Sequence, residues 1–168
     1  MSNQLTEQDE IILLSFNQLN PKKVKLVACE PMPEQVRNRV GRNNIIQNQC
    51  YCNAAKSVLS LRWSKKLGSS VQYILGVADM GLGFHGHAWI EVDGVPHDPT
   101  FEILDKGIEG RKYFEVSRFT PDELDTFLDE NKSIPPAFPD HAPRDSFDLS
   151  FWRTLKDKIS LIDSECAA

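Results

Sequence analysis

The sequence lacks any long hydrophobic run. No stretch approaches the roughly 18 consecutive apolar residues that a membrane-spanning helix needs. Residues 1–4 carry no basic side chain, and the apolar run at residues 11–14 is too short for the core of a signal peptide. We therefore expect a cytoplasmic protein that does not associate with a membrane.

Cysteine is also scarce, with four residues at positions 29, 50, 52 and 166. Cys50 and Cys52 form a C-x-C pair, and no second pair follows at the spacing that a structural zinc cluster requires. A reducing cytoplasm disfavours structural disulfides. We therefore expect free thiols, a fold held together by its hydrophobic core, and no metal or other cofactor.

Basic residues are fewer than acidic ones. The chain has 19 lysine and arginine residues against 24 aspartate and glutamate residues, so its net charge is −5 at pH 7. Proteins that bind nucleic acids in general usually carry a basic surplus. General nucleic-acid binding is therefore not expected.

The order of the predicted elements indicates an α+β fold in one domain of 168 residues. Apolar periodicity and capping signals predict helices over about 6–19, 33–40, 50–66, 120–131 and 151–162. Strands are predicted over 24–29, 71–78, 84–92, 95–100 and 112–119. The expected core, about 45–119, is an antiparallel sheet packed against a helix that begins at Cys50. A helical extension (1–44) precedes it, and helices with a proline-rich loop (120–168) follow.

A β-hairpin at residues 84–100 contains three of the four histidines. The pair Asp93-Gly94 favours a two-residue turn, which would place Val92 opposite Val95 and Ile90 opposite His97. Because side chains alternate along a strand, one face then carries His85, His87, Trp89 and Asp98. His87 and Asp98 become diagonal neighbours, with roughly 7–8 Å between their backbones. This pairing is typical of a histidine base oriented by a carboxylate.

Cys50 provides a nucleophile for that base. At the start of a helix, backbone N–H groups and the helix dipole stabilise a thiolate. Cys50, His87 and Asp98 would together form a catalytic triad. Gln47 or backbone N–H groups beside Cys50 could stabilise an oxyanion, and Trp89 could either line the cleft or cover the core. Cys50 lies on the apolar stripe of the predicted helix, which should face the sheet and therefore His87. Helical periodicity thus favours Cys50 over Cys52 as the nucleophile, and Cys52 stays open as the alternative.

These motifs resemble the core of the transglutaminase-like, papain-related superfamily. The resemblance covers residues 45–101 and rests on the helical cysteine, the H-A-W run at 87–89 and the D-P-T run at 98–100. The C-Y-x-N-A run at 50–54 also resembles small bacterial and phage proteins. One departure is Asn48, because the family usually has glycine two residues before the cysteine. The resemblance implies a Cys-His-Asp triad in a fold that hosts proteases, amidases, transferases and inactive binding modules.

The leading hypothesis is therefore a cytosolic thiol hydrolase or acyltransferase that acts on a peptide, isopeptide or side-chain amide. Its expected partner is a protein or peptide substrate, and its oligomeric state is open. One alternative is an inactive member of this fold that binds or inhibits a partner. Another is a metal enzyme that uses His85, His87 and Asp98 as ligands.

Overall fold

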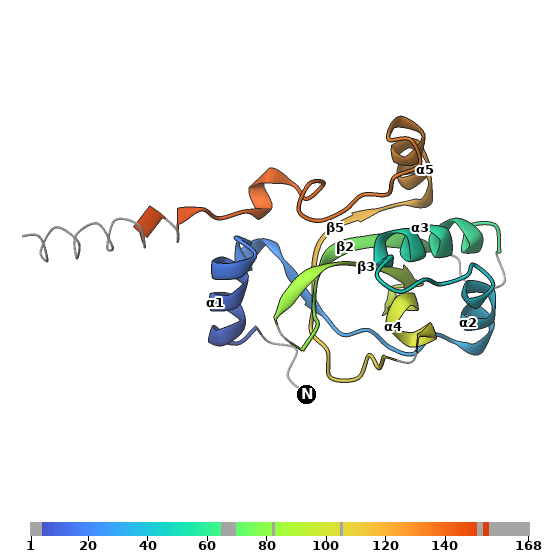
Figure 1. The fold of residues 1–168 in the computed structure, drawn as a ribbon, viewed down its shortest axis with the longest axis horizontal. Coiled ribbons are helices and arrows are strands. Elements are labelled where there is room, and N and C mark those ends of the chain that lie inside the picture. Colours follow the sequence, from blue (N-terminus) through green and yellow to red (C-terminus); the bar gives the residue numbers. More distant parts are fainter. Residues whose placement is uncertain (1–4, 65–69, 82, 105, 151–152, 155–168) are drawn as a thin grey trace, which may run out of the picture.

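The computed structural model describes residues 5–64, 70–81, 83–104, 106–150 and 153–154. Their strands form one curled antiparallel sheet in the order β1-β5-β2-β3-β4 (Figure 1). The strands are β1 (Lys25–Val27), β2 (Val71–Asp79), β3 (Phe84–Val92), β4 (Val95–His97) and β5 (Tyr113–Phe119). The helices are α1 (Glu7–Phe16), α2 (Glu34–Gly41), α3 (Cys50–Leu61), α4 (Pro99–Ile103) and α5 (Pro121–Glu130), with 3-10 turns η1 (Pro21–Lys23) and η2 (Arg144–Ser146). The predicted α+β class with an antiparallel sheet is confirmed.

The predicted hairpin register is also confirmed. Val92 pairs with Val95 and Ile90 with His97. Asp93 and Gly94 have φ angles of 50° and 83°. These are the angles of a type I′ turn, which matches the strand twist and needs positive φ at both positions, as Asp-Gly tolerates. The turn therefore fixes which side chains of β3 share a face.

The two faces of the sheet are covered by different helices. Ala54, Val58 and Leu61 of α3 pack with Leu75, Ala88 and Ile90 in one apolar cluster. A second cluster joins Ile74, Trp89 and Tyr113 to Phe101 of α4. Figure 1 shows α3 above and α4 below the sheet. Side chains that alternate along β3 therefore enter two different cores.

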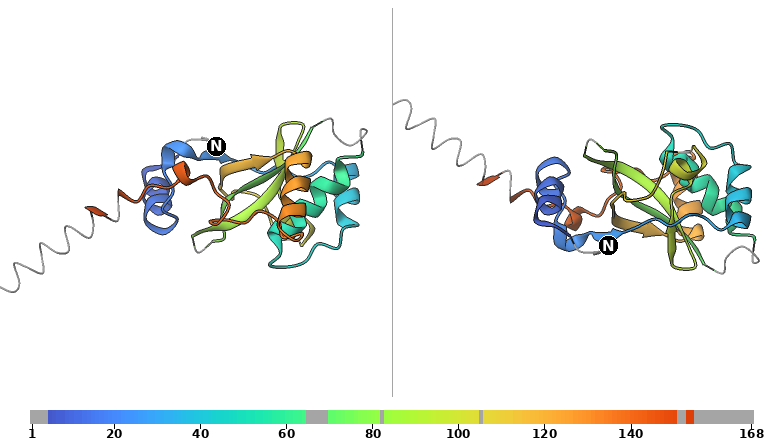
Figure 2. Two further views of the ribbon diagram at one scale, coloured as in Figure 1. Left: turned by 90° about the horizontal axis from the view of Figure 1, so that it is seen from above. Right: turned by 90° about the horizontal axis from the view of Figure 1, so that it is seen from below.

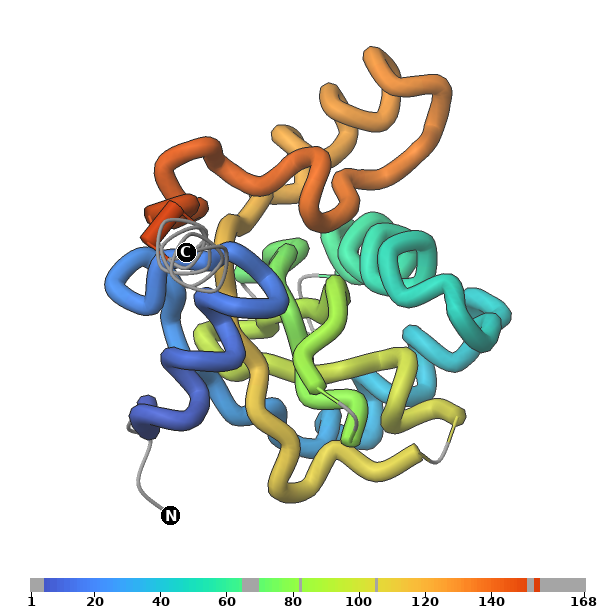
Figure 3. Tube along the Cα trace, turned by 60° about the vertical axis from the view of Figure 1, so that its left-hand side comes forward, coloured from blue at the N-terminus to red at the C-terminus, as the bar shows by residue number. Residues whose placement is uncertain are grey.

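The segment before α3 and the segment after α5 both pack against the sheet. The edge strand β1 pairs with β5, and Met32 and Val36 join the core beneath α3, so the segment predicted as an N-terminal extension is part of the core. After α5, the chain returns across the α3 side towards α1 (Figures 2 and 3). The hydroxyl of Tyr73 donates to the carbonyl of Pro136, which holds this returning segment against the sheet.

Some predicted boundaries were wrong. The strand predicted to reach residue 100 ends at His97, and Pro99–Ile103 forms α4. Asp98 is its N-cap and Pro99 its first residue, a combination that favours a helix start over continued extension. Helix α3 ends at Leu61 rather than at residue 66. The predicted closing helix at 151–162 lies outside the described residues, except for 153–154.

Candidate active site

His87 and Asp98 form a buried pair. His87 Nε2 lies 2.7 Å from Asp98 Oδ2, and the two residues are 1% and 0% exposed. His87 extends from the middle of β3, whereas Asp98 begins α4 directly after β4. The Asp93-Gly94 turn brings these two positions together, so the sequence-predicted pairing is present in the structure.

Four donors surround the Asp98 carboxylate. Its Oδ1 accepts from the backbone N–H groups of Thr100 and Phe101, each at 3.0 Å. Its Oδ2, which faces His87, also accepts from the Tyr113 hydroxyl at 2.9 Å. A buried carboxylate without partners would be strongly unfavourable, and these bonds compensate for its loss of water. They also fix the orientation of the carboxylate toward the imidazole.

Opposed effects set the pKa of His87. Burial disfavours the imidazolium and lowers the pKa, whereas the charge of Asp98, its hydrogen bond, and the neighbouring Cys50 thiol raise it. The balance raises the pKa of His87 from its ordinary 6.5 to about 9. At neutral pH the ring is therefore held as an imidazolium, the form that stabilises a neighbouring thiolate.

Cys50 interacts with His87 although α3 packs on the other face of β3. His87 points to the face opposite Ala88, whereas the apolar residues of α3 pack on the Ala88 face. In the described sheet, β4 pairs with β3 only from Ile90 to Val92, which leaves the His87 region of β3 without a strand on that side. The first residue of α3 interacts with the imidazole there. The expectation that the apolar stripe of the helix would itself face His87 was wrong.

The second ring nitrogen of His87 is available to the thiol. Among the described residues, Nδ1 has no hydrogen-bond partner of regular geometry although it is buried. Asp98 holds a proton on Nε2, since a carboxylate only accepts. Nδ1 is therefore the ring nitrogen that remains free to exchange a proton. The Cys50 thiol is the neighbouring group that interacts with the ring and could take part in that exchange.

The turn before α3 sets the position of Cys50. Asn48 has a φ angle of 60°, a left-handed conformation that glycine and asparagine adopt most readily. Asparagine therefore suits this backbone position. The N-cap Gln49 makes no side-chain capping bond, so N–H groups of the first turn remain as donors near Cys50. Gln47 is exposed in the same turn, with no described contact to the site.

Asn53 connects the two halves of the site and was missed by the sequence analysis. It is fully buried on α3. Its amide bonds both the N–H and the carbonyl of Ile46, at 3.1 and 2.7 Å, and the Thr100 hydroxyl at 3.1 Å. Ile46 precedes Cys50, and Thr100 belongs to the helix that Asp98 caps. A polar residue among the apolar positions of the predicted helix was the available signal.

The remaining cysteines differ from Cys50. Cys52 is half-buried on α3, and Cys50 rather than Cys52 is the thiol that acts on the His87 ring. Cys29 lies near Asp98 and Tyr113, where burial and the Asp98 charge raise its pKa well above the ordinary value. Cys29 is therefore held as a neutral thiol beside the site.

The other predicted candidates lie outside the pair. His85 is exposed, and His97 is buried on the opposite face, with Nδ1 2.7 Å from the Glu30 carbonyl. Trp89 is 0% exposed and lies in the core beside His87, so it does not line an open cleft. Among the described residues, no group of three or more His, Cys, Asp or Glu side chains could hold a metal ion. The proposed His85–His87–Asp98 ligand set is therefore not assembled.

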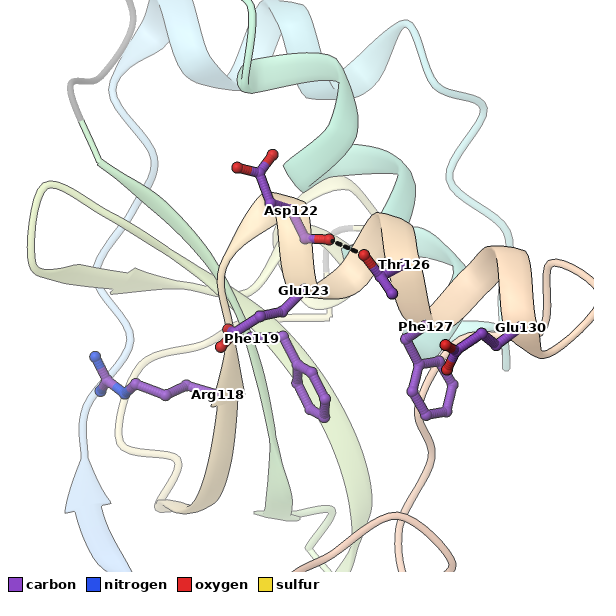
Figure 4. Close-up of a pocket in the computed structure, with 7 residues that line it drawn as sticks. All are labelled: Arg118, Phe119, Asp122, Glu123, Thr126, Phe127 and Glu130. Carbon is purple, nitrogen blue, oxygen red and sulfur yellow. Dashed lines mark hydrogen bonds between the residues drawn. The ribbon is translucent and has the colours of Figure 1, made fainter.

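A separate groove of about 490 Å³ lies between β5 and α5 (Figure 4). The rings of Phe119 and Phe127 line it and meet edge to face, with centroids 6.0 Å apart. Three charged residues that line it are hydrogen-bonded within the chain. Arg118 donates to Glu115, Asp122 accepts from Arg62, and Glu123 accepts from the backbone N–H of Thr120. None of Cys50, His87 and Asp98 lines this groove.

Comparison with protein-family models, with curated proteins and with solved structures found no match to the chain. Within the described part of the chain, no helix has the length and apolarity to cross a membrane. The candidate site consists of a helix-start cysteine, a buried histidine and a capping aspartate.

Proposed function

We propose that the protein is a thiol-dependent hydrolase or acyltransferase of the transglutaminase-like, papain-related type. Cys50 would be the nucleophile, His87 the acid and base, and Asp98 the residue that orients His87. The observation that carries this proposal is the buried imidazole, bonded to Asp98 through Nε2 and neighboured by the Cys50 thiol. A buried, paired histidine beside a helix-start cysteine is costly to maintain for packing alone.

We propose that the first half-reaction starts from a Cys50 thiolate beside the His87 imidazolium. The thiolate of Cys50 attacks the acyl carbon of an amide, and an S–C bond forms as the carbonyl oxygen becomes an oxyanion. First-turn N–H groups of α3 are the nearest donors for that charge, with Gln47 as a further candidate. When the C–N bond breaks, His87 gives a proton to the leaving nitrogen. The amine departs and an acyl-thioester remains on Cys50.

The second half-reaction regenerates the enzyme. His87, now neutral, takes a proton from water or from an incoming amine, which attacks the thioester carbon. The S–C bond breaks, the thiolate leaves, and the imidazolium beside it stabilises the returning charge. Water gives hydrolysis, and an amine gives acyl transfer. Asp98 keeps its hydrogen bond to Nε2 through both steps and holds the ring orientation.

Formation of the acyl-enzyme tests the proposal directly. The protein would be incubated with an activated ester, p-nitrophenyl acetate, and with glutamine-containing peptides, and the modified residue identified by mass spectrometry. We expect acylation of Cys50 that hydroxylamine reverses, as for a thioester. Cys52→Ser should acylate like the wild type, whereas Cys50→Ala should not acylate.

Two results would contradict the proposal. One is acylation of Cys52 in preference to Cys50. The other is acylation of Cys50 at the rate of an unstructured thiol, unaffected by His87→Ala. Either would show that the three side chains do not act as a unit.

A non-catalytic role is the second candidate. The carbonyls of Pro136 and Phe138 are bonded by Tyr73 and Tyr51, two residues whose hydroxyls lie near Cys50. The returning segment thus packs close to the thiol, as it could in a fold that binds a partner without catalysis. A biological effect that survives Cys50→Ala in full would favour this role.

A further inference from the structure

We propose that Tyr113 is a positioning residue of the Cys50–His87–Asp98 site, whose hydroxyl limits how strongly Asp98 holds the His87 proton. This inference rests on the proposed function and extends it, because it adds a residue that acts on the acid–base group through Asp98. Neither the triad pattern nor the sequence motifs point to Tyr113.

The hydroxyl of Tyr113 and the imidazole of His87 share one oxygen atom. Tyr113 donates to Asp98 Oδ2 at 2.9 Å, and His87 Nε2 lies 2.7 Å from the same atom. The other carboxylate oxygen is occupied by the N–H groups of Thr100 and Phe101. The hydroxyl therefore competes with the imidazole for electron density on Oδ2, while the N–H bonds prevent the carboxylate from turning away.

Packing holds the Tyr113 ring in this position. The residue is fully buried, and its backbone pairs with Val27 of β1 and with Ala78 of β2. The ring meets Trp89 edge to face, with centroids 5.3 Å apart, and lies 6.2 Å from the His87 ring. A hydroxyl carried by a central strand cannot follow a moving carboxylate, so it fixes the place of Asp98.

The hydroxyl stays protonated at the pH values where the site would work. Burial and the charge of Asp98 raise the pKa of Tyr113 well above its ordinary value. It therefore remains a donor to the carboxylate. A donor on Oδ2 disperses the carboxylate charge, and less charge remains to hold the proton on His87. Its removal should make His87 a weaker acid and slow proton delivery to a leaving group.

Titration of the His87 ring by NMR tests this role without requiring a substrate. The wild type would be compared with Tyr113→Phe and with Tyr73→Phe, which removes a buried hydroxyl that donates to a loop carbonyl instead. We expect the His87 midpoint to rise by roughly half a pH unit or more in Tyr113→Phe, a factor of about three in proton affinity. Tyr73→Phe should leave the midpoint in place.

A second substitution covers the case in which Tyr113→Phe does not fold. Site-specific 3-fluorotyrosine at position 113 keeps the ring and is a stronger donor, so the His87 midpoint should move down. An unchanged midpoint in the folded variant, or an equal change in Tyr73→Phe, would overturn the role of Tyr113.

Iodoacetamide alkylation of Cys50 in the same samples tests the proposed function separately. If wild-type Cys50 reacts no faster than in His87→Ala, the proposed function fails, and the positioning role fails with it. If the alkylation rate of Cys50 depends on His87 but the His87 midpoint is unchanged in Tyr113→Phe, the proposed function stands and only the role of Tyr113 is lost.

Discussion

His87 Nε2 lies 2.7 Å from Asp98 Oδ2, and neither side chain is in contact with solvent. The two residues come from a strand and from the cap of the next helix, joined by a turn of two residues. Hydrophobic residues in these places would avoid the cost of burying a charged pair. The arrangement agrees with the acid–base role that we propose for His87.

Asp98→Asn should lower the pKa of His87. The carboxylate charge is a main cause of the raised value, and without it burial acts in the opposite direction. We expect the NMR midpoint to fall from about 9 to near or below 6.5. Alkylation of Cys50 at pH 7.5 should slow by about tenfold or more, because the imidazolium partner is lost.

Glu102→Gln is the matched control for that substitution. Glu102 is also on α4, but its carboxylate accepts from the N–H of Met32. This control should leave both the His87 midpoint and the alkylation rate close to wild type. Equal effects of the two substitutions would show that Asp98 acts only through general electrostatics.

Stability should decrease between pH 6.5 and pH 9. The pKa of His87 is raised in the folded protein, so the folded state binds its proton more tightly than the unfolded chain. The resulting stabilisation is fully present below pH 6.5 and is lost as the pH rises through about 9. Its size is on the order of 3 kcal/mol. The free energy of unfolding, measured with urea, should be smaller at pH 9 than at pH 6. This difference should shrink in His87→Gln. An equal difference in the wild type and in His87→Gln would contradict the role of His87.

Asn53→Ala should destabilise the fold and disturb the site together. It removes two partly buried bonds to the backbone groups of Ile46 and a buried bond to the Thr100 hydroxyl. We expect a loss of roughly 2–4 kcal/mol in the free energy of unfolding, with slower Cys50 alkylation. Asn43→Ala also removes an asparagine bond to α3, at the half-exposed Ser60 hydroxyl. It should cost less than about 1 kcal/mol, and alkylation should be unchanged.

Two glycines of the sheet should respond differently to alanine. A Cβ at Gly76 would overlap the backbone carbonyl of Phe114 and approach the Trp89 ring to 2.8 Å. Gly76→Ala should therefore cost about 3 kcal/mol or more. At Gly86 the closest atom is the Tyr51 hydroxyl at 2.6 Å, the end of a side chain that can move. Gly86→Ala should therefore destabilise the protein less than Gly76→Ala, and adding Tyr51→Phe should recover part of the loss. Thermal unfolding of the single variants and of the Gly86→Ala/Tyr51→Phe double variant measures these effects.

Local signals explain what the sequence could predict. The residues Asp93 and Gly94 specify the conformation of their turn. The turn sets the strand register, and side-chain alternation then places His87 and Asp98 on one face. The capping boxes at Thr6 and Thr120 define the starts of α1 and α5 in the same way. Each of these inferences depends on residues close together in the chain.

Long-range packing explains what the sequence could not predict. The interaction of Cys50 with His87 joins α3 to a side chain on the opposite face of β3, which alternation does not reveal. Tyr113 and Asn53 reach Asp98 and its helix from strands and helices distant in sequence. The alternating pattern predicts a strand residue at Asp98, although Asp followed by Pro is also a helix start, and the fold decides between them.

The rate of Cys50 alkylation by iodoacetamide as a function of pH is the most direct test of the central claim. For wild-type protein we expect Cys50 to react at pH 6–7, where an ordinary thiol is largely protonated, and to lose this reactivity in His87→Ala. Cys52→Ser should retain it. If wild-type Cys50 instead follows the pH dependence of a free cysteine and is indifferent to His87, then the imidazole and the thiol do not form an activated pair, and the account is wrong.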